Sequence, residues 1–97
     1  MSDLHVVATI PSKPGSEDGL REALLTLVAA TREEEGCLEY DLFESLSAPG
    51  TFVTVEAWRS QADLDAHLDS PHLAAAMEAS GEHLGGPIAL HPLAHVG

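Results

Sequence analysis

The segment at residues 51–58 constrains the fold most, because its sequence, TFVTVEAW, is apolar on both faces of a strand. Side chains alternate along a strand, so three small residues share one face, and two aromatic residues share the other with a carboxylate. These two sets are Val53, Val55 and Ala57, and Phe52, Glu56 and Trp58. A strand with two apolar faces needs a covering on each. We expect the small face to pack under helices and the aromatic face to meet the sheet of an identical subunit, with either a pocket or a filled interface between the sheets.

The remaining apolar segments predict three more strands and two helices. The predicted strands cover residues 4–10, 37–46, 51–58 and 88–96, and the first predicted helix covers residues 17–35. The second helix begins after Ser60, breaks at Ser70-Pro71 and runs to about Ser80. This β-α-β-β-α-β order is the ferredoxin-like motif, an α+β fold with an antiparallel sheet. The 97 residues are enough for one domain, residues 1–97.

Cap and turn residues mark the ends of these helices. The residues that suit N-cap positions are Ser16, Ser60 and Ser70. Gly36 is expected to end the first helix as its C′ residue. The run at residues 33–35, three glutamates, would then lie where the helix dipole disfavours acids, and we expect a solvated, slightly frayed end. The glycine-containing segment 81–87 is either a lid or a plain connection.

The charge balance excludes two classes of partner. Sixteen acids against four bases give a net charge of −12, which repels the phosphates of nucleic acid and an anionic membrane surface. A lone cysteine, Cys37, leaves no internal disulfide. Residues 1–4 lack the basic and apolar parts of a signal peptide, and no apolar run is long enough to span a bilayer. We therefore expect a cytoplasmic protein.

Several motifs, in this order and at this spacing, resemble the antibiotic biosynthesis monooxygenase family. They are residues 13–15, residues 31–33 with 36–38 and 40–41, residues 52–56 with Trp58, and residues 66–68 with 70–72. The resemblance implies a dimeric α+β barrel, and it leaves open assembly beyond the dimer. It also implies oxidation of a quinol or polycyclic phenol by O₂ with no metal or organic cofactor. A second hypothesis is a non-enzymatic protein that binds a small aromatic molecule on the same scaffold.

One branch of that family degrades haem and uses an asparagine, a tryptophan and a histidine. The resemblance places Ala8, His67 and Met77 at those three positions, and the chain contains no asparagine. Haem degradation is therefore not expected.

Oxygenation without a cofactor needs a base that turns a phenol, whose pKa is near 10, into its anion. His67 and His72, on either side of the helix break, are the candidates for this base or for hydrogen bonds to the substrate. The other interpretation is structural: His67 is favoured at a helix end by the dipole, and His72 is a solvated first-turn residue.

Glu56 shares a face with two aromatic residues, where an unpaired carboxylate is costly to bury. It either orients a histidine or acts as a base, or it pairs with an arginine. Trp58 and Phe52 either line an aromatic pocket or belong to the core. The substrate pocket is expected either between the sheet and the helices or at the dimer interface. Tyr40 places its hydroxyl either in this cavity or at its rim.

The six histidines raise the question of a metal. His67 and His72 are five residues apart with a helix break between them, and His91 and His95 lie roughly 13 Å apart at strand rise. Neither pair has the spacing of a local chelate. No metal is expected from sequence, and only a site assembled across the fold is left open.

Overall fold

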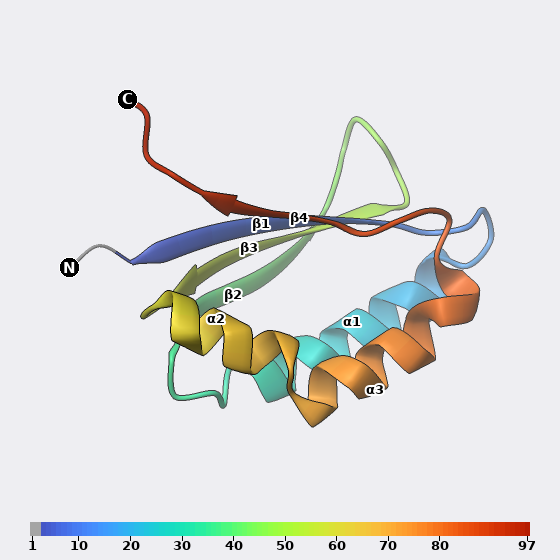
Figure 1. Cartoon of the computed structure of the whole chain (residues 1–97). Coiled ribbons are helices and arrows are strands. Elements are labelled where there is room, and N and C mark those ends of the chain that lie inside the picture. The colour runs from blue at the N-terminus through green and yellow to red at the C-terminus, as the bar shows by residue number, and fades with distance from the viewer. Residues whose placement is uncertain (1–2) are drawn as a thin grey trace.

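The sheet of this protein has four strands in the order β2-β3-β1-β4, and every neighbouring pair is antiparallel (Figure 1). The computed structural model describes residues 3–97. Met1 and Ser2 lie outside the described residues. They belong to residues 1–4, which we predicted are not part of a signal peptide. The elements are β1 (Leu4–Pro11), α1 (Glu17–Thr31), β2 (Cys37–Glu44), β3 (Thr51–Trp58), α2 (Gln61–Leu68), α3 (Pro71–Ser80), a short 3₁₀ turn (Gly81–His83) and β4 (Ala89–Leu93). The predicted ferredoxin-like α+β order is confirmed.

The break between α2 and α3 forms as the serines predict. The Ser60 side chain accepts a hydrogen bond from the Asp63 backbone N–H, and the Ser70 side chain accepts one from the Leu73 N–H. Both serines have extended backbones, and Pro71 occupies the first turn of α3. Side chains that cap the exposed N–H groups start the two helices at these positions.

The first helix ends earlier than predicted, at Thr31, and Gly36 is not its left-handed cap. Arg32 caps α1 in a right-handed conformation, and the chain turns through Glu34, whose N–H bonds to the Thr31 carbonyl at 2.9 Å. Acids are unfavourable at a helix C-terminus, so the run 33–35 leaves the helix. Gly36 is needed for another reason: the Asp63 side chain occupies the place where a Cβ would stand.

β3 has the predicted bounds, whereas β1 runs one residue further than predicted, to Pro11, and β2 and β4 are shorter than predicted. β2 stops at Glu44 rather than at residue 46, and β4 covers only Ala89–Leu93 of the predicted 88–96. The limits follow from pairing, because β4 finds partners only along His5–Thr9 of β1. Backbone groups beyond the last partner gain nothing from an extended conformation.

The assignment of the two sheet faces was wrong. Phe52, Glu56 and Trp58 face the helices and are buried, whereas Val53 and Val55 lie on the open face. In Figure 1 the α-helices lie together on one side of the sheet. The space between a sheet and helices must be filled to the density of a crystal, and the large side chains do this. The small β-branched residues are therefore left on the open face.

That open face carries apolar side chains on all four strands. Its exposed or half-buried apolar members are Val7, Phe43, Val53, Val55 and Leu93. An apolar sheet face needs a covering. We expected the helices to leave one apolar face open, and they do, but the open face is the one with the small residues and not the aromatic one.

The segment 81–87 is held in place by backbone hydrogen bonds. The Lys13 N–H donates to the His83 carbonyl at 2.8 Å, and the Gly85 N–H donates to the Pro11 carbonyl at 2.9 Å. Ser12 also forms a bridge with Leu84. These bonds make the segment a fixed connection and leave the lid interpretation without support. In the described part of the chain, no helix has the length and apolarity needed to cross a membrane.

Candidate functional site

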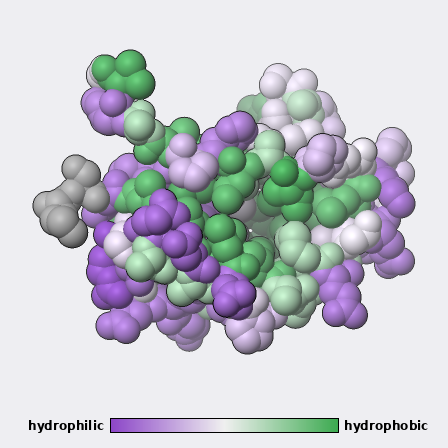
Figure 2. Space-filling view, viewed as in Figure 1, coloured by the Kyte–Doolittle hydropathy of each residue, from purple (hydrophilic) through white to green (hydrophobic). Residues whose placement is uncertain are grey.

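An apolar cavity of about 190 Å³ lies between the sheet and the helices. All three α-helices and all four strands contribute to its lining, together with the residue just before β4. The lining residues are Ala8, Ile10, Leu27, Tyr40, Thr54, Glu56, His67, Leu68, Leu73, Met77, Ile88 and Leu90. Figure 2 shows the apolar side chains gathered around a hollow between the sheet and the helices. A dry apolar cavity of roughly 150 Å³ holds benzene, so this one has room for an aromatic ring.

Both oxygens of the Glu56 carboxylate, on the cavity wall, already accept a hydrogen bond. Glu56 is 3% exposed, and its two oxygens each accept one hydrogen bond, from the Thr54 hydroxyl at 2.6 Å and from the Trp58 indole N–H at 2.9 Å. Two donors compensate much of the cost of burying the carboxylate. Among the described residues Glu56 thus contacts Thr54 and Trp58 rather than a histidine or an arginine, two of the alternatives left open by the sequence, while its role as a base stays a prediction.

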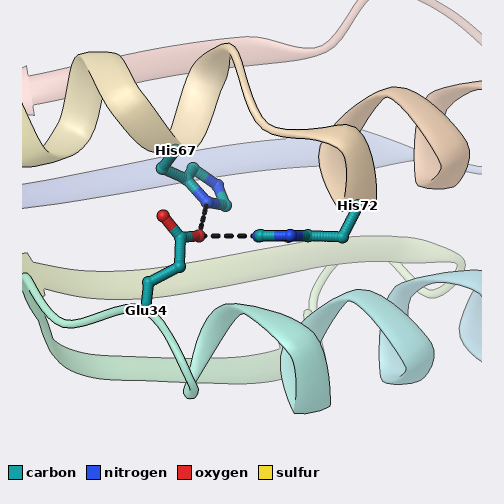
Figure 3. A group of neighbouring side chains, drawn as sticks. All are labelled: Glu34, His67 and His72. Atoms are coloured by element: carbon teal, nitrogen blue, oxygen red, sulfur yellow. Dashed lines mark hydrogen bonds and ion pairs between the residues drawn. The ribbon is translucent and has the colours of Figure 1, made fainter.

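A different glutamate binds the two candidate histidines. The Oε2 atom of Glu34 lies 2.6 Å from His67 Nδ1 and 2.7 Å from His72 Nε2 (Figure 3). An ionised carboxylate is only an acceptor, so both ring nitrogens donate to it. The side chains of Glu34, His67 and His72 are 17%, 3% and 28% exposed. Glu34, which we expected at a solvated, frayed helix end, is therefore half-buried and accepts two hydrogen bonds.

The helix break brings the two histidines to one carboxylate. His67 lies in the last turn of α2, and His72 is the second residue of α3. Between them, the Ser70 hydroxyl donates to the His67 carbonyl at 2.6 Å and accepts from the Leu73 N–H at 3.2 Å. Ser70 therefore sets the angle at which both rings approach Glu34. The sequence does not indicate Glu34, because nothing distinguishes it from its two glutamate neighbours before the turn is built.

The ring of His67 is held by aromatic neighbours as well. Its centroid lies 4.7 Å from that of Trp58 and 5.5 Å from that of Tyr40. Of the predicted wall residues, Tyr40 lines the cavity, whereas Trp58 and Phe52 are core residues outside its described lining. Trp58 thus supports His67 from behind.

Burial also sets the ionisation of two neighbouring acids. It raises the pKa of the Tyr40 phenol far above its usual value, and the negative charge of Glu56 adds to the effect. The Tyr40 hydroxyl therefore keeps its proton and can donate it to a bound oxygen atom. Burial, with Glu34 and Glu56, also raises the pKa of Cys37 to about 11. This half-buried thiol is a poor nucleophile.

Glu34, His67 and His72 also have the donor atoms of a metal site. A carboxylate oxygen and two ring nitrogens all lie within 4.8 Å of one another. They are the only such set of three in residues 3–97. Spacing along the chain did not reveal them, because the three ligands come from three separate segments.

The comparisons with known proteins agree with this architecture. The family model described as antibiotic biosynthesis monooxygenase matches residues 3–79, which is most of the chain. This chain belongs to the antibiotic biosynthesis monooxygenase family. A family relative from Mycobacterium tuberculosis, "Putative monooxygenase Rv0793", is 38% identical over 93 residues, covering 96% of this chain and 91% of the relative. "Probable quinol monooxygenase YgiN" of Escherichia coli K12 is 37% identical over 89 residues, covering 78% and 83%.

Solved structures show the same fold. The structure of Rv0793 superposes with a TM-score of 0.88 at 36% identity and covers 99% of this chain and 97% of that one. PA3566 from Pseudomonas aeruginosa superposes with a TM-score of 0.90 at 30% identity, covering 100% and 97%. The resemblance inferred from the sequence motifs is thereby confirmed at the level of family and fold.

Proposed function

We propose that this protein is a cofactor-independent monooxygenase that oxidises a small quinol or phenol with O₂, with His67 as the base. The observation that carries the proposal is the position of His67. Its ring lies on the wall of an apolar cavity, and its Nδ1 is bonded to Glu34. Within residues 3–97 its other nitrogen, Nε2, has no hydrogen-bond partner. A neutral imidazole that donates through Nδ1 accepts a proton at Nε2.

The proposed chemistry balances with a quinol as the only reductant. Nε2 of His67 takes the proton of a substrate hydroxyl, and Glu34 stabilises the imidazolium that results. The electron-rich anion then reduces O₂ beside the mainly apolar walls of the cavity. One oxygen atom enters the ring and the other leaves as water, so one quinol and one O₂ give one hydroxyquinone and one water. The quinol supplies all four electrons.

Two further residues have proposed roles in binding. The neutral Tyr40 hydroxyl can donate to a substrate oxygen on the cavity wall. His72 donates to the same Glu34 oxygen as His67, and it therefore fixes the carboxylate that orients the base. Family membership and the name of the quinol monooxygenase relative favour this activity over passive binding.

Oxygen consumption with a reduced naphthoquinone, measured in EDTA, tests this function. We expect O₂ uptake above the autoxidation rate and a hydroxyquinone product by mass spectrometry. Ala8→Phe, which fills the cavity from β1, should reduce that uptake at least about tenfold, because substrate can no longer enter. Saturable quinol binding with no enzymatic uptake would instead support the non-enzymatic binding protein.

We also propose that two copies pair through the open sheet face. Val55 lies near its centre, opposite Val7 on β1 and Asp41 on β2. Face-to-face sheets pack about 10 Å apart, so a partner would bury these apolar side chains. Val55→Asp places a second carboxylate beside Asp41, and burying it unpaired is costly.

For Val55→Asp we expect the dissociation constant of the dimer to rise at least about 100-fold. Sedimentation equilibrium measures this constant. Leu46→Asp is the matched control, because this loop residue is 98% exposed and its replacement should leave the dimer intact. A wild-type chain that sediments as a monomer at tens of micromolar would refute the pairing.

A further inference from the structure

We propose that Glu34, His67 and His72 form a binding site for a divalent transition-metal ion that prefers imidazole ligands, such as Zn²⁺. In Figure 3 the three side chains converge from the turn after α1, the end of α2 and the start of α3. Two imidazoles and one carboxylate are a donor set that Zn²⁺ takes in proteins. The inference concerns binding alone and does not depend on the proposed oxygenase activity.

The three donor atoms already lie within 4.8 Å of one another and must adjust their spacing to hold an ion. Donors bound to one tetrahedral Zn²⁺ at roughly 2.0–2.2 Å stand about 3.3 Å apart. The Glu34 oxygen is now 2.6 Å and 2.7 Å from the two nitrogens, so it must move back by several tenths of an ångström. Glu34 can do so through its own torsions, because it is held by these two contacts and lies on a turn. The buried His67 ring supplies the fixed point.

Electrostatics around the site favour a cation. Among the described residues, Glu34 has no arginine or lysine partner, because Arg21, Arg32 and Arg59 bind other carboxylates. Glu34 follows the C-terminus of α1, and His67 lies in the last turn of α2. Both helix ends carry partial negative charge. The N-terminus of α3 at His72 opposes this, but the net charge of −12 raises the local concentration of cations.

Three protein ligands leave at least one position on a tetrahedral ion open to water or another ligand. Binding through Nδ1 also has a consequence for the base. A neutral imidazole whose Nδ1 lone pair binds a metal carries its proton on Nε2. The metal-bound form therefore lacks the free nitrogen that the proposed oxygenase uses, and the ion should inhibit turnover. This last consequence rests on the proposed function.

Calorimetric titration of the full chain with ZnCl₂, without a histidine tag and after removal of EDTA, tests the site. We expect one ion per chain and a rise in melting temperature, because a ligand that binds only the folded state stabilises it. Visible absorption with Co²⁺ should report coordination by nitrogen. Glu34→Gln and His72→Ala should each weaken binding at least about tenfold.

His95→Ala is the matched control, since this exposed histidine lies outside the cluster, and it should bind like the wild type. Glu34→Gln is nearly isosteric and decides the matter even if His72→Ala folds poorly. A wild-type chain that binds no ion, or a Glu34→Gln chain that binds with unchanged affinity, would overturn the proposal. Because no substrate is present, either result leaves the oxygenase proposal untouched, and the EDTA assay leaves this one untouched.

Discussion

His67→Gln is expected to lower kcat for quinol oxidation by about 10²- to 10⁴-fold, the range typical of a lost general base. Glutamine keeps a polar side chain of similar reach, but its amide does not take a proton near neutral pH. KM should change little, since the apolar walls of the cavity remain. Steady-state O₂ uptake over a range of quinol concentrations separates the two constants.

Glu34→Gln should have a smaller effect, about 10- to 100-fold on kcat, because it removes the charge behind the base and leaves the base in place. His95→Gln, at an exposed histidine outside the site, serves as the matched control and should retain full activity. An unchanged kcat in folded His67→Gln protein would remove His67 from the mechanism. A loss in Glu34→Gln alone would point to the carboxylate as the base.

Trp58→Ala is expected to be the most destabilising single change in the core, at about 3–5 kcal/mol in the free energy of unfolding. Trp58 is 0% exposed, packs against Tyr40 and His67, and donates its indole N–H to Glu56. The alanine leaves a cavity and also one Glu56 oxygen without its donor. Small domains unfold with about 5–15 kcal/mol, so this loss is a large part of the total.

Trp58→Phe separates the hydrogen bond from the packing. It keeps an aromatic ring and removes the indole N–H, and we expect a cost of about 1–3 kcal/mol from the unsatisfied carboxylate oxygen. Glu56→Leu in the same chain should recover part of that cost, because the polar group itself is then gone. Urea unfolding at one fixed protein concentration measures all three variants, with Leu46→Ala as an exposed control. Equal stability of Trp58→Phe and the wild type would show that the Glu56 contact contributes nothing.

The two predictions meet at His67, which joins the core to the site. Its ring packs on Trp58, and Trp58 is held by Glu56. Glu56 was predicted to orient a histidine directly. In the structure it accepts a hydrogen bond from Trp58, and Trp58 in turn packs against His67. Trp58 thus supports the ring of His67 from outside the cavity lining, whereas Glu56 itself lies on the cavity wall.

Local chemistry in the sequence determined the order of the elements, the caps and the motifs of the family. Ser60, Ser70 and Pro71 act on neighbouring backbone groups, so the helix break could be predicted from residues that are adjacent in the chain. The alternation of residues 51–58 is also a pattern of adjacent residues, and it showed that both faces of this strand are apolar.

Only the tertiary structure decided which face packs inward and which glutamate meets the histidines. Both strand faces are apolar, so the choice depends on the volume to be filled beneath the helices, and the larger side chains fill it. Glu34, His67 and His72 come together because α1 ends at Thr31 and the chain turns there. Such a contact joins residues more than thirty positions apart, and no local pattern in the sequence records the path of the chain between them.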